Sequence, residues 1–499
     1  MKHYHCFLLL LPILFGITGC KNHEDAGREG FLNFYAINDY HGRISSNDQQ
    51  GDIGISKISS FLNEQKFNHE LEYVFLNAGD LWQDTYESNQ NKGACLTEAM
   101  EVMGCEAMEL GNHEFDWGLD TIKENKSNAS KCEYLGANIY YFDNSLGVPT
   151  TQASDIASPY KIIERNGFKI GVIGIIGKGQ ITSITSSNWE NLTFVDPLSI
   201  VERYSDELRI EKQCDLVVLL AHASTGDLSE GFCNEVTSIN EDTSKPFIDC
   251  CFTAHTHVLE NKEYNGVPFV QGGSKGKNVS HIEFDMRKDK PVVTKHEQLT
   301  VEAKKTDRNI DKIVNKYITR SFKKIRDEKV FTVETKQIIS TVDAGRLQAY
   351  ATYEYLKHIE QEKSITITAV FNNGGRDSVD ISETSGVLTR EMIFNLTPFT
   401  NKTYVAKVSG ANILVAMRNF RYFAPVAQKI EQTEHYYIAC IDYVLLHKDT
   451  TRRYDNFSSY DGNPVYIENV FPDQIITSVF KGKTVEKAFF SDKRFNNLY

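Results

Sequence analysis

The amino-acid sequence predicts an α/β protein with two domains. Its 499 residues exceed the length of one ordinary hydrophobic core, so a second domain is expected. Five short apolar segments have the length of buried strands and end in Asp, Asn or His, and segments with helical periodicity lie between them. Because binding sites of open α/β sheets form beyond the strand ends, these polar residues are the first candidates for function.

The composition is that of a globular and acidic protein. Hydrophobic residues make up 41% of the chain, aromatic residues 11% and charged residues 24%, and the formal net charge is −13. This charge argues against binding to a nucleic-acid polymer, and no basic cluster offsets it. A negatively charged protein that acts on phosphates needs local cations, so we expect metal ions or a focused arginine site.

The N-terminus has the features of a targeting segment. The apolar run Phe7–Phe15 is too short to span a bilayer as a permanent helix. It is followed by the tetrad I-T-G-C, ending at Cys20, which resembles a bacterial lipobox. We therefore expect an exported protein with a signal peptide over 1–19, a lipid on Cys20 and a polar tether over 20–30. The lipid would anchor it to the bacterial cell envelope, at the periplasmic face or the cell surface; the alternative is plain secretion.

Eight cysteines remain beyond the signal peptide and the lipidated position. An even number in an exported protein favours disulfides, but the spacings do not determine the pairs. No C-x-x-C zinc pattern is present. We expect some of these residues to be paired and others to be simply buried; they are Cys95, Cys105, Cys132, Cys214, Cys233, Cys250, Cys251 and Cys440.

The first two predicted strands each end in a carboxylate. Phe31–Ile37 is followed by Asp39 and His41, which are two residues apart and therefore point to the same side of an extended chain. Tyr73–Asn77 is followed by Asp80. These side chains suit a divalent metal, and the alternative in both places is an ordinary polar turn.

The segment Leu110–Gly118, with the sequence L-G-N-H-E-F-D-W-G, holds the densest group of reactive side chains. It follows an apolar run of strand character, and a helix is predicted before that over Leu96–Met103. Asn112 is a suitable metal ligand. His113, with Asp116 three residues later, has the pattern of an imidazole oriented by a carboxylate to act as a general acid. The alternative is a polar loop that caps a helix through Asn112.

Three histidines follow the later predicted strands. His222 comes after one apolar strand, and His255 and His257 form an H-x-H pair after the next. The alternative for each is a turn residue. The elements predicted in this region are the strands Phe168–Ile176, Asp215–Leu220 and Ile248–Thr253 and the helix Pro197–Lys212.

Together the strand ends supply seven candidate metal ligands, a number that two divalent ions sharing one carboxylate would account for. Nitrogen and oxygen donors without thiolates are compatible with Zn, Mn, Fe or Mg, so the identity of the metals stays open. The candidates are Asp39, His41, Asp80, Asn112, His222, His255 and His257.

The order D-x-H, G-D, G-N-H-E-F-D, H and H-x-H resembles the calcineurin-like metallophosphoesterases, and the version G-N-H-E-F-D-W-G resembles the bacterial 5′-nucleotidase family. The resemblance implies a β-sandwich flanked by helices, a four-layer αββα fold, over 31–300. It also implies a smaller α/β substrate-binding domain over 331–499. The one departure in the metal motifs is Ala254, where the family usually has Gly; we expect little effect unless the backbone there needs a positive φ.

The resemblance also assigns a role to each residue of the motifs. It places one metal on Asp39, His41 and His257 and the other on Asn112, His222 and His255, with Asp80 bridging both and His113 with Asp116 as the catalytic dyad.

Residues 301–330 are predicted to form one amphipathic helix that connects the two domains. Apolar residues recur at helical spacing from Ile310 to Ile325 within a charge-rich segment. A coiled coil is a weaker interpretation, because the pattern covers only about two heptads.

The second domain carries the candidate substrate contacts. A helix is predicted over Gly345–Lys357 and a strand over Ile365–Phe371. The loop after this strand resembles the N-x-G-G-x-R substrate loop of the family, but Arg376 lies one residue early and Asp377 takes the usual Arg position. An arginine beside a glycine pair can make a bidentate contact to phosphate or carboxylate.

Two aromatic residues are assigned to the base of a nucleotide. Phe399 and Asn401 lie in a segment that resembles the P-F-G-N segment of the family, whose Phe stacks on the base; the alternative for Phe399 is a core position. The second aromatic is assigned to Tyr454, although the glycine-rich loop that precedes it in the family is absent here. Arg452 and Arg453 are candidate new phosphate contacts.

These observations predict a metal-dependent hydrolase of nucleotide phosphate esters. The leading hypothesis is a 5′-nucleotidase that converts nucleoside 5′-monophosphates to nucleoside and phosphate for nucleotide salvage outside the cytoplasm. A UDP-sugar or dinucleotide pyrophosphatase and a 2′,3′-cyclic-nucleotide phosphodiesterase are alternatives on the same metals. A non-catalytic surface-binding lipoprotein is a further alternative, against which the complete ligand set argues. We expect a monomer whose partner is a nucleotide.

Overall fold

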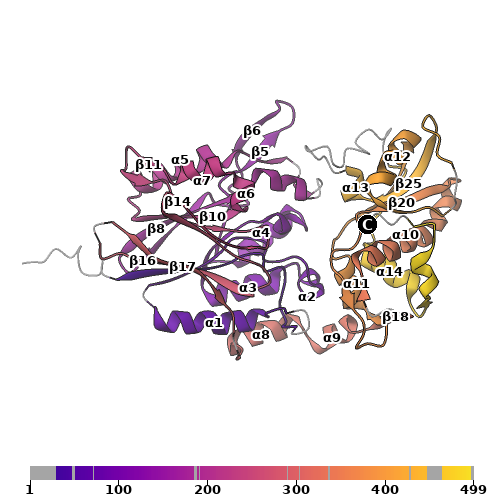
Figure 1. Ribbon diagram of the computed structural model, residues 1–499, viewed down its shortest axis with the longest axis horizontal. Helices are drawn as coiled ribbons and strands as arrows, with labels where there is room; N and C mark the ends of the chain where they lie inside the picture. Colours follow the sequence, from indigo (N-terminus) through magenta and orange to yellow (C-terminus); the bar gives the residue numbers. More distant parts are fainter. Residues whose placement is uncertain are drawn as a thin grey trace, which may run out of the picture.

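The computed structural model of the chain contains two domains joined by a short helical segment (Figure 1). No helix within the part of the chain that the structure describes is long and apolar enough to cross a membrane. The predicted signal peptide, Cys20, Arg452, Arg453 and Tyr454 lie outside the described residues, which are 30–47, 51–70, 72–184, 188–189, 191–288, 290–302, 304–334, 338–425, 429–446 and 464–495.

Two six-stranded sheets pack face to face in the N-terminal domain. Their strand orders are β17-β16-β1-β2-β3-β4 and β14-β15-β13-β10-β8-β7. A layer of buried apolar side chains, among them Phe34, Val172 and Phe252, fills the space between the sheets. The strands are β1 (Phe31–Ile37), β2 (Tyr73–Asn77), β3 (Cys105–Glu109), β4 (Glu133–Leu135), β7 (Tyr160–Arg165), β8 (Phe168–Ile176), β10 (Leu216–His222), β13 (Cys250–Thr253), β14 (Leu259–Tyr264), β15 (Val267–Gly272), β16 (Asn278–Asp285) and β17 (Val292–Thr300).

Helices cover the outer faces of both sheets. The first sheet packs against α1 (Ile55–Asn68) and α3 (Ala94–Met103), and the second packs against α5 (Pro197–Asp206) and α7 (Glu230–Val236). The four layers confirm the predicted αββα arrangement. The predicted strands 31–37, 73–77 and 168–176 coincide with β1, β2 and β8, because each is a largely apolar run that is almost entirely buried.

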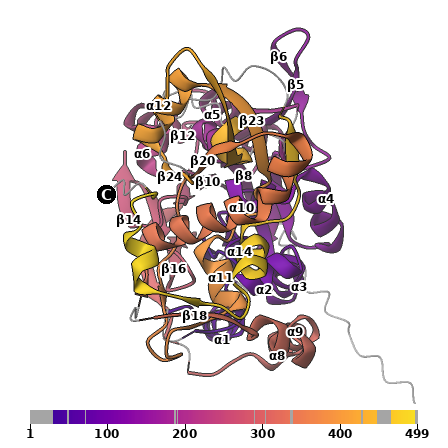
Figure 2. The same ribbon diagram turned by 90° about the vertical axis from the view of Figure 1, so that its right-hand side faces the viewer.

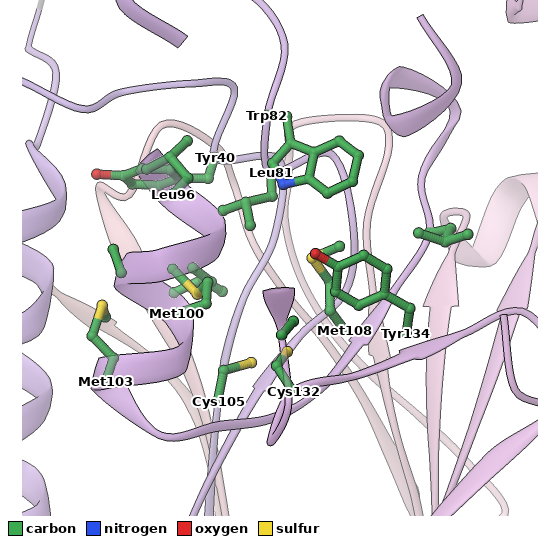
Figure 3. Packing of buried hydrophobic residues seen from close by; sticks show 14 of the residues in the cluster. Tyr40, Leu81, Trp82, Leu96, Met100, Met103, Cys105, Met108, Cys132 and Tyr134 are labelled. Carbon is green, nitrogen blue, oxygen red and sulfur yellow. The ribbon is translucent and has the colours of Figure 1, made fainter. Parts of the chain in front are cut away.

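The cysteines belong to the hydrophobic cores. All eight that the structure describes are buried free thiols, so the expectation that some are paired is wrong for these residues. Figure 3 shows Cys105 and Cys132 among the side chains packed beneath α3 and Trp82. Burial raises the pKa of Cys95 to about 12, as expected of a thiol that serves as a small apolar side chain.

The connecting segment forms two helices, and the prediction of one continuous helix is wrong. α8 (Arg308–Tyr317) ends at Ile318, whose backbone (φ −96°, ψ 66°) is not helical. α9 (Arg320–Arg326) then starts with a cap in which Thr319 accepts a hydrogen bond from the backbone N–H of Phe322. Ile310 of α8 is fully buried in the core that contains α1 and α3, so α8 belongs to the helical layer of the N-terminal domain.

The C-terminal domain is built on a five-stranded sheet with the order β24-β20-β25-β23-β26. The long helix α10 (Thr341–Lys363) packs against this sheet and against α14 (Pro472–Phe480), as Figure 2 shows. It is longer than the predicted helix at both ends. It begins one turn earlier because Ser340 and Asp343 form a capping box there. The strands are β20 (Ile367–Asn372), β23 (Thr403–Ser409), β24 (Arg421–Phe423), β25 (His435–Ile441) and β26 (Tyr466–Glu468), and α12 (Gly410–Asn419) follows β23.

Candidate metal and substrate site

The metal-ligand candidates lie at or just beyond the carboxyl ends of five strands. β1, β2, β3, β10 and β13 pair in parallel within their sheets, so their ends reach a common edge. Five of the candidates have left-handed backbone, a conformation that is strained for residues other than glycine: Asp39 (φ 47°), His41 (φ 54°), Asp80 (φ 55°), His255 (φ 77°) and His257 (φ 59°). Strain of this kind persists where the surrounding structure holds it, and it is concentrated at functional sites.

Ala254 is not among the residues with positive φ. Its side chain is fully buried, and its backbone N–H donates to the carbonyl of Ala223 at 3.2 Å. The one condition under which alanine was expected to matter here, a positive φ, is therefore not met.

Asp39, His41 and His257 form the first group of ligands. Nε2 of His41 is 2.8 Å from Nε2 of His257, and Oδ1 of Asp39 is 3.4 Å from the same nitrogen of His257. Asp39 and His41 are completely buried. Nδ1 of His41 is 3.3 Å from the carbonyl of Gln83, which leaves Nε2 facing the other two side chains.

Asp80, Asn112, His222 and His255 form the second group. Nε2 of His222 is 3.2 Å from Oδ2 of Asp80 and 3.2 Å from Oδ1 of Asn112, and Nδ1 of His255 is 3.1 Å from Oδ1 of Asn112. Nδ1 of His222 is 2.9 Å from the carbonyl of Ala78, so its Nε2 is directed at the other ligands. In each group the imidazole and carboxylate residues place one donor atom apiece within 4.8 Å of the others, as a metal site requires.

The charges of the second group complement one another. Burial alone would raise the pKa of Asp80, but His222 and His113 outweigh it and hold that pKa well below its usual range. Burial lowers the pKa of His222, yet Asp80 raises it to about 10. Asp80 is therefore an ionised carboxylate among imidazoles, which is a strong donor for a cation.

Glu114 organises the loops that carry these ligands, a role that the sequence analysis missed. Its carboxylate accepts hydrogen bonds from the backbone N–H groups of Asp80 (2.9 Å), Leu81 (2.8 Å) and Gly111 (2.8 Å). Gly111 is needed at its position, because a Cβ there would lie 2.2 Å from Oδ1 of Asp80. Glu114 lies within the N-H-E-F motif, and this position was the one feature of the sequence that could have marked it as functional.

His113 and Asp116 form the predicted pair. Nδ1 of His113 is 2.8 Å from Oδ2 of Asp116, and the backbone N–H of His113 donates to Oδ1 of Asp80 at 2.9 Å. Burial lowers the pKa of His113, but the carboxylates of Asp116 and Asp80 outweigh it and raise that pKa to about 9. The imidazole is thus protonated at neutral pH, which suits a general acid.

A cavity of about 410 Å³ lies between the two domains, and predicted residues of both domains line it. Three of the ligand candidates, Asp39, His41 and His222, are not in its walls. Asp80, Asn112, His113, Asp116, His255 and His257 line it from the N-terminal domain, and Asn373, Gly374, Gly375, Arg376, Phe399, Thr400, Asn401, Lys402, Asp442 and Tyr443 line it from the C-terminal domain.

The loop that contains Phe399 spans the domain interface. The carbonyl of Pro398 accepts hydrogen bonds from Nε2 of Gln83 at 2.7 Å and from Nδ2 of Asn89 at 3.3 Å. The ring of Phe399 lies nearly parallel to His113, with centroids 6.4 Å apart and planes at 18°, and the guanidinium carbon of Arg376 is 5.7 Å from its centroid. Phe399 therefore lies in the cavity wall and not in the hydrophobic core.

The substrate side contains residues that the sequence analysis did not assign. Nδ2 of Asn401 donates to Oδ1 of the buried Asp442 at 2.7 Å, so Asp442 fixes the orientation of the predicted Asn401. Tyr443 lines the same cavity directly after β25. Its position after a strand in the second domain was the only signal available.

Comparison with known protein families assigns both domains. Residues 32–259 match the family described as calcineurin-like phosphoesterase, and residues 343–471 match the 5′-nucleotidase C-terminal domain. The two matches fall in the two structural domains. They confirm the predicted fold class and the prediction that the chain is a hydrolase.

Individual relatives agree with these matches at low sequence identity. A 5′-nucleotidase of Vibrio vulnificus is 23% identical over 435 residues, covering 76% of this chain and 73% of the relative. An apyrase of Tabanus yao is 31% identical over 223 residues, covering 43% of this chain but only 38% of the relative. The crystal structure of a 5′-nucleotidase precursor from Thermus thermophilus has the same fold, with a TM-score of 0.70 and 17% identity over 92% of this chain and 99% of that chain.

Proposed function

From the premise that the chain joins a calcineurin-like phosphoesterase domain to a 5′-nucleotidase C-terminal domain, we propose that it is a 5′-nucleotidase. It hydrolyses nucleoside 5′-monophosphates to nucleoside and phosphate. The observation that carries this proposal is the interdomain cavity, where the ligand groups and the His113–Asp116 pair face Arg376 and Phe399.

The donor set fits two divalent metal ions. Imidazole nitrogens, carboxylates and an amide oxygen, with no thiolate, suit Zn, Mn, Fe or Mg. When bound, such a pair of ions polarises the phosphoryl oxygens and lowers the pKa of a water molecule. In this proposal Asp39, His41 and His257 hold one ion, Asn112, His222 and His255 hold the other, and Asp80 is shared.

His113 supplies the proton that the leaving oxygen needs. Its Nδ1 is held by Asp116, so Nε2 is the nitrogen available to the substrate. Because the carboxylates keep the imidazole protonated at neutral pH, His113 can donate a proton as the ester bond breaks. Asp116 fixes the orientation of the ring and stabilises its charge.

The C-terminal wall binds the rest of the nucleotide. Arg376 contacts the phosphate with its planar guanidinium, and Phe399 stacks on the base. Tyr443 is the other described aromatic residue of this cavity, and Asn401, oriented by Asp442, offers an amide to the polar groups of the nucleoside.

The same proposal includes export and lipid attachment at Cys20, supported by the I-T-G-C sequence at the end of the apolar leader. Cys20→Ser should release the protein from the membrane fraction of the producing cell. Retention of that variant in the membrane fraction would contradict an anchor at Cys20.

The experiment measures phosphate release by the soluble chain starting after Cys20, supplied with Mn²⁺ or Zn²⁺. The substrates are AMP, UDP-glucose, 2′,3′-cyclic AMP and bis-p-nitrophenyl phosphate, with coupled readouts where phosphate is not released directly. Turnover of AMP that is lost in His113→Ala supports the proposal. Turnover of UDP-glucose alone would instead assign a pyrophosphatase activity, and turnover of the diesters alone would assign a cyclic phosphodiesterase activity.

A further inference from the structure

Asp84 has a backbone conformation that aspartate rarely adopts. Its φ of +127° lies in the region that favours glycine, and only 5% of the residue is exposed. The position is four residues after Asp80, in the loop that follows β2. A strained and buried side chain next to a functional loop is retained only where neighbouring contacts hold it.

The carboxylate of Asp84 lies between two arginines from different domains. Oδ2 accepts a hydrogen bond from Nη2 of Arg43 at 3.1 Å, and Oδ1 is 3.9 Å from Nε of Arg376. Oδ1 accepts no hydrogen bond from the residues that the structure describes. Nη1 of Arg43 donates to the carbonyl of His41 at 3.0 Å, so a continuous set of contacts joins the metal loop to Arg376.

The contact with Asp84 leaves the Nη atoms of Arg376 without a hydrogen bond to any residue that the structure describes. Asp84 approaches through Nε, whereas bidentate recognition of phosphate can use the pair of Nη atoms. The Arg376 side chain is 31% exposed and lines the catalytic cavity. The Asp84 side chain is 3% exposed and lines a different cavity, of about 510 Å³, that does not include Arg376.

We infer that Asp84 is a positioning residue that holds the Arg376 guanidinium across the domain interface for contact with the substrate phosphate. An arginine that is already oriented loses less conformational entropy when the phosphate binds. The inference rests on the proposed hydrolysis of a phosphate ester, but it does not require that the ester is a nucleotide.

A merely structural role for Asp84 makes a different prediction. If the carboxylate only stabilised the domain interface, its removal would change KM and phosphate affinity equally with and without Arg376. A double-mutant cycle separates the two roles, because a positioning effect needs the arginine.

The test compares Asp84→Asn and Asp84→Gly, each in the wild-type and the Arg376→Ala background, using the metal-loaded chain. It measures KM and kcat for whichever ester the wild type hydrolyses, the affinity for inorganic phosphate by calorimetry, and the Tm. Glycine removes the carboxylate and relieves the strained φ, so this variant should be folded. Asp155→Asn is the control, because its carboxylate pairs with Lys123 at 2.7 Å and it lines neither of the two cavities.

We expect both Asp84 variants to raise KM and to weaken phosphate binding about fivefold, as is typical of losing one partly exposed ion pair. kcat should change less than about twofold, since the metal ligands and His113 are intact. In the Arg376→Ala background the effect should disappear, and Asp155→Asn should leave KM and phosphate affinity unchanged. An unchanged KM and phosphate affinity, or equal effects in both backgrounds, would overturn the inference. Failure of the wild type to hydrolyse any ester would instead contradict the proposed function, and the phosphate-binding cycle would still decide the role of Asp84.

Discussion

The two walls of the interdomain cavity are built differently. On the N-terminal side the ligand candidates Asp39, His41 and His222 are fully buried, and hydrogen bonds to backbone carbonyls orient the two imidazoles. On the C-terminal wall Arg376 and Phe399 stand on loops that touch the other domain through a few polar contacts. The catalytic chemistry is therefore assigned to a rigid scaffold, and substrate recognition to loops that can vary without disturbing it.

The difference fits the two departures from the family, a single small change at Ala254 in the metal motifs and a shifted loop around Arg376 on the substrate side. Each metal ligand lies close to another ligand, so replacing one would leave the others unbalanced in a buried site. Arg376 and Phe399 contact each other and the cavity, and a shift of one residue in the loop is accommodated at the partly exposed surface.

The largest effect is expected for Asp80→Asn, which keeps the shape of the side chain and removes the shared charge. The amide is a weaker donor to both metals, and kcat/KM should fall by about a thousandfold or more. Metal analysis of the same preparation should show fewer ions per chain. Asp196→Asn, at the cap of α5, is the control. An Asp80→Asn variant that keeps both its metals and its activity would contradict the role assigned to this carboxylate.

His113→Ala tests the pair on the rigid wall without touching a proposed ligand. Loss of the general acid should lower kcat by about 10²–10⁴-fold while the metal content stays the same. Asp116→Asn should move the alkaline limb of the pH–rate profile to lower pH, since Asp116 raises the pKa of His113 and the protonated ring is the active form. A limb that stays in place would contradict the assigned acid.

Glu114→Gln tests whether the loops need the carboxylate that gathers their N–H groups. The amide can accept from fewer of the four backbone N–H donors, so metal affinity should weaken by about 10–100-fold, the range for residues that orient ligands. Competition with a chelator measures this affinity. Unchanged retention of the metals would show that the loops keep their positions without Glu114.

The smallest effect is expected on the variable wall, from Phe399→Leu. Loss of stacking on a base should raise KM about tenfold, whereas metal content should not change. Phe67→Leu, at a position that is 88% exposed, is the control. An unaltered KM for AMP, with normal folding, would remove Phe399 from the substrate contacts.

The sequence predicted the N-terminal domain well because its strands are long apolar runs that end at polar residues. It could not predict the left-handed backbone of five ligand candidates, which follows from the way neighbouring loops close on one another. The connecting segment was predicted as one helix because its apolar spacing continues past Ile318, whereas the break depends on a local cap at Thr319.

The substrate wall was predicted only where a motif resembled the family. Arg376 and Phe399 were found in this way, and both line the cavity. Tyr443 and Asp442 were missed because their one signal, a position after a strand, is weak by itself; the contact of Asp442 with Asn401 forms only when β23 and β25 pair. Contacts between distant segments, not local propensity, decide such positions.

The most direct test of the account is a metal titration of the metal-free soluble chain, with AMP hydrolysis followed at each step. We expect AMP hydrolysis to rise with added Mn²⁺ or Zn²⁺ and to reach its plateau at two ions per chain. Two bound ions without hydrolysis of AMP, or hydrolysis that does not depend on added metal, would contradict it.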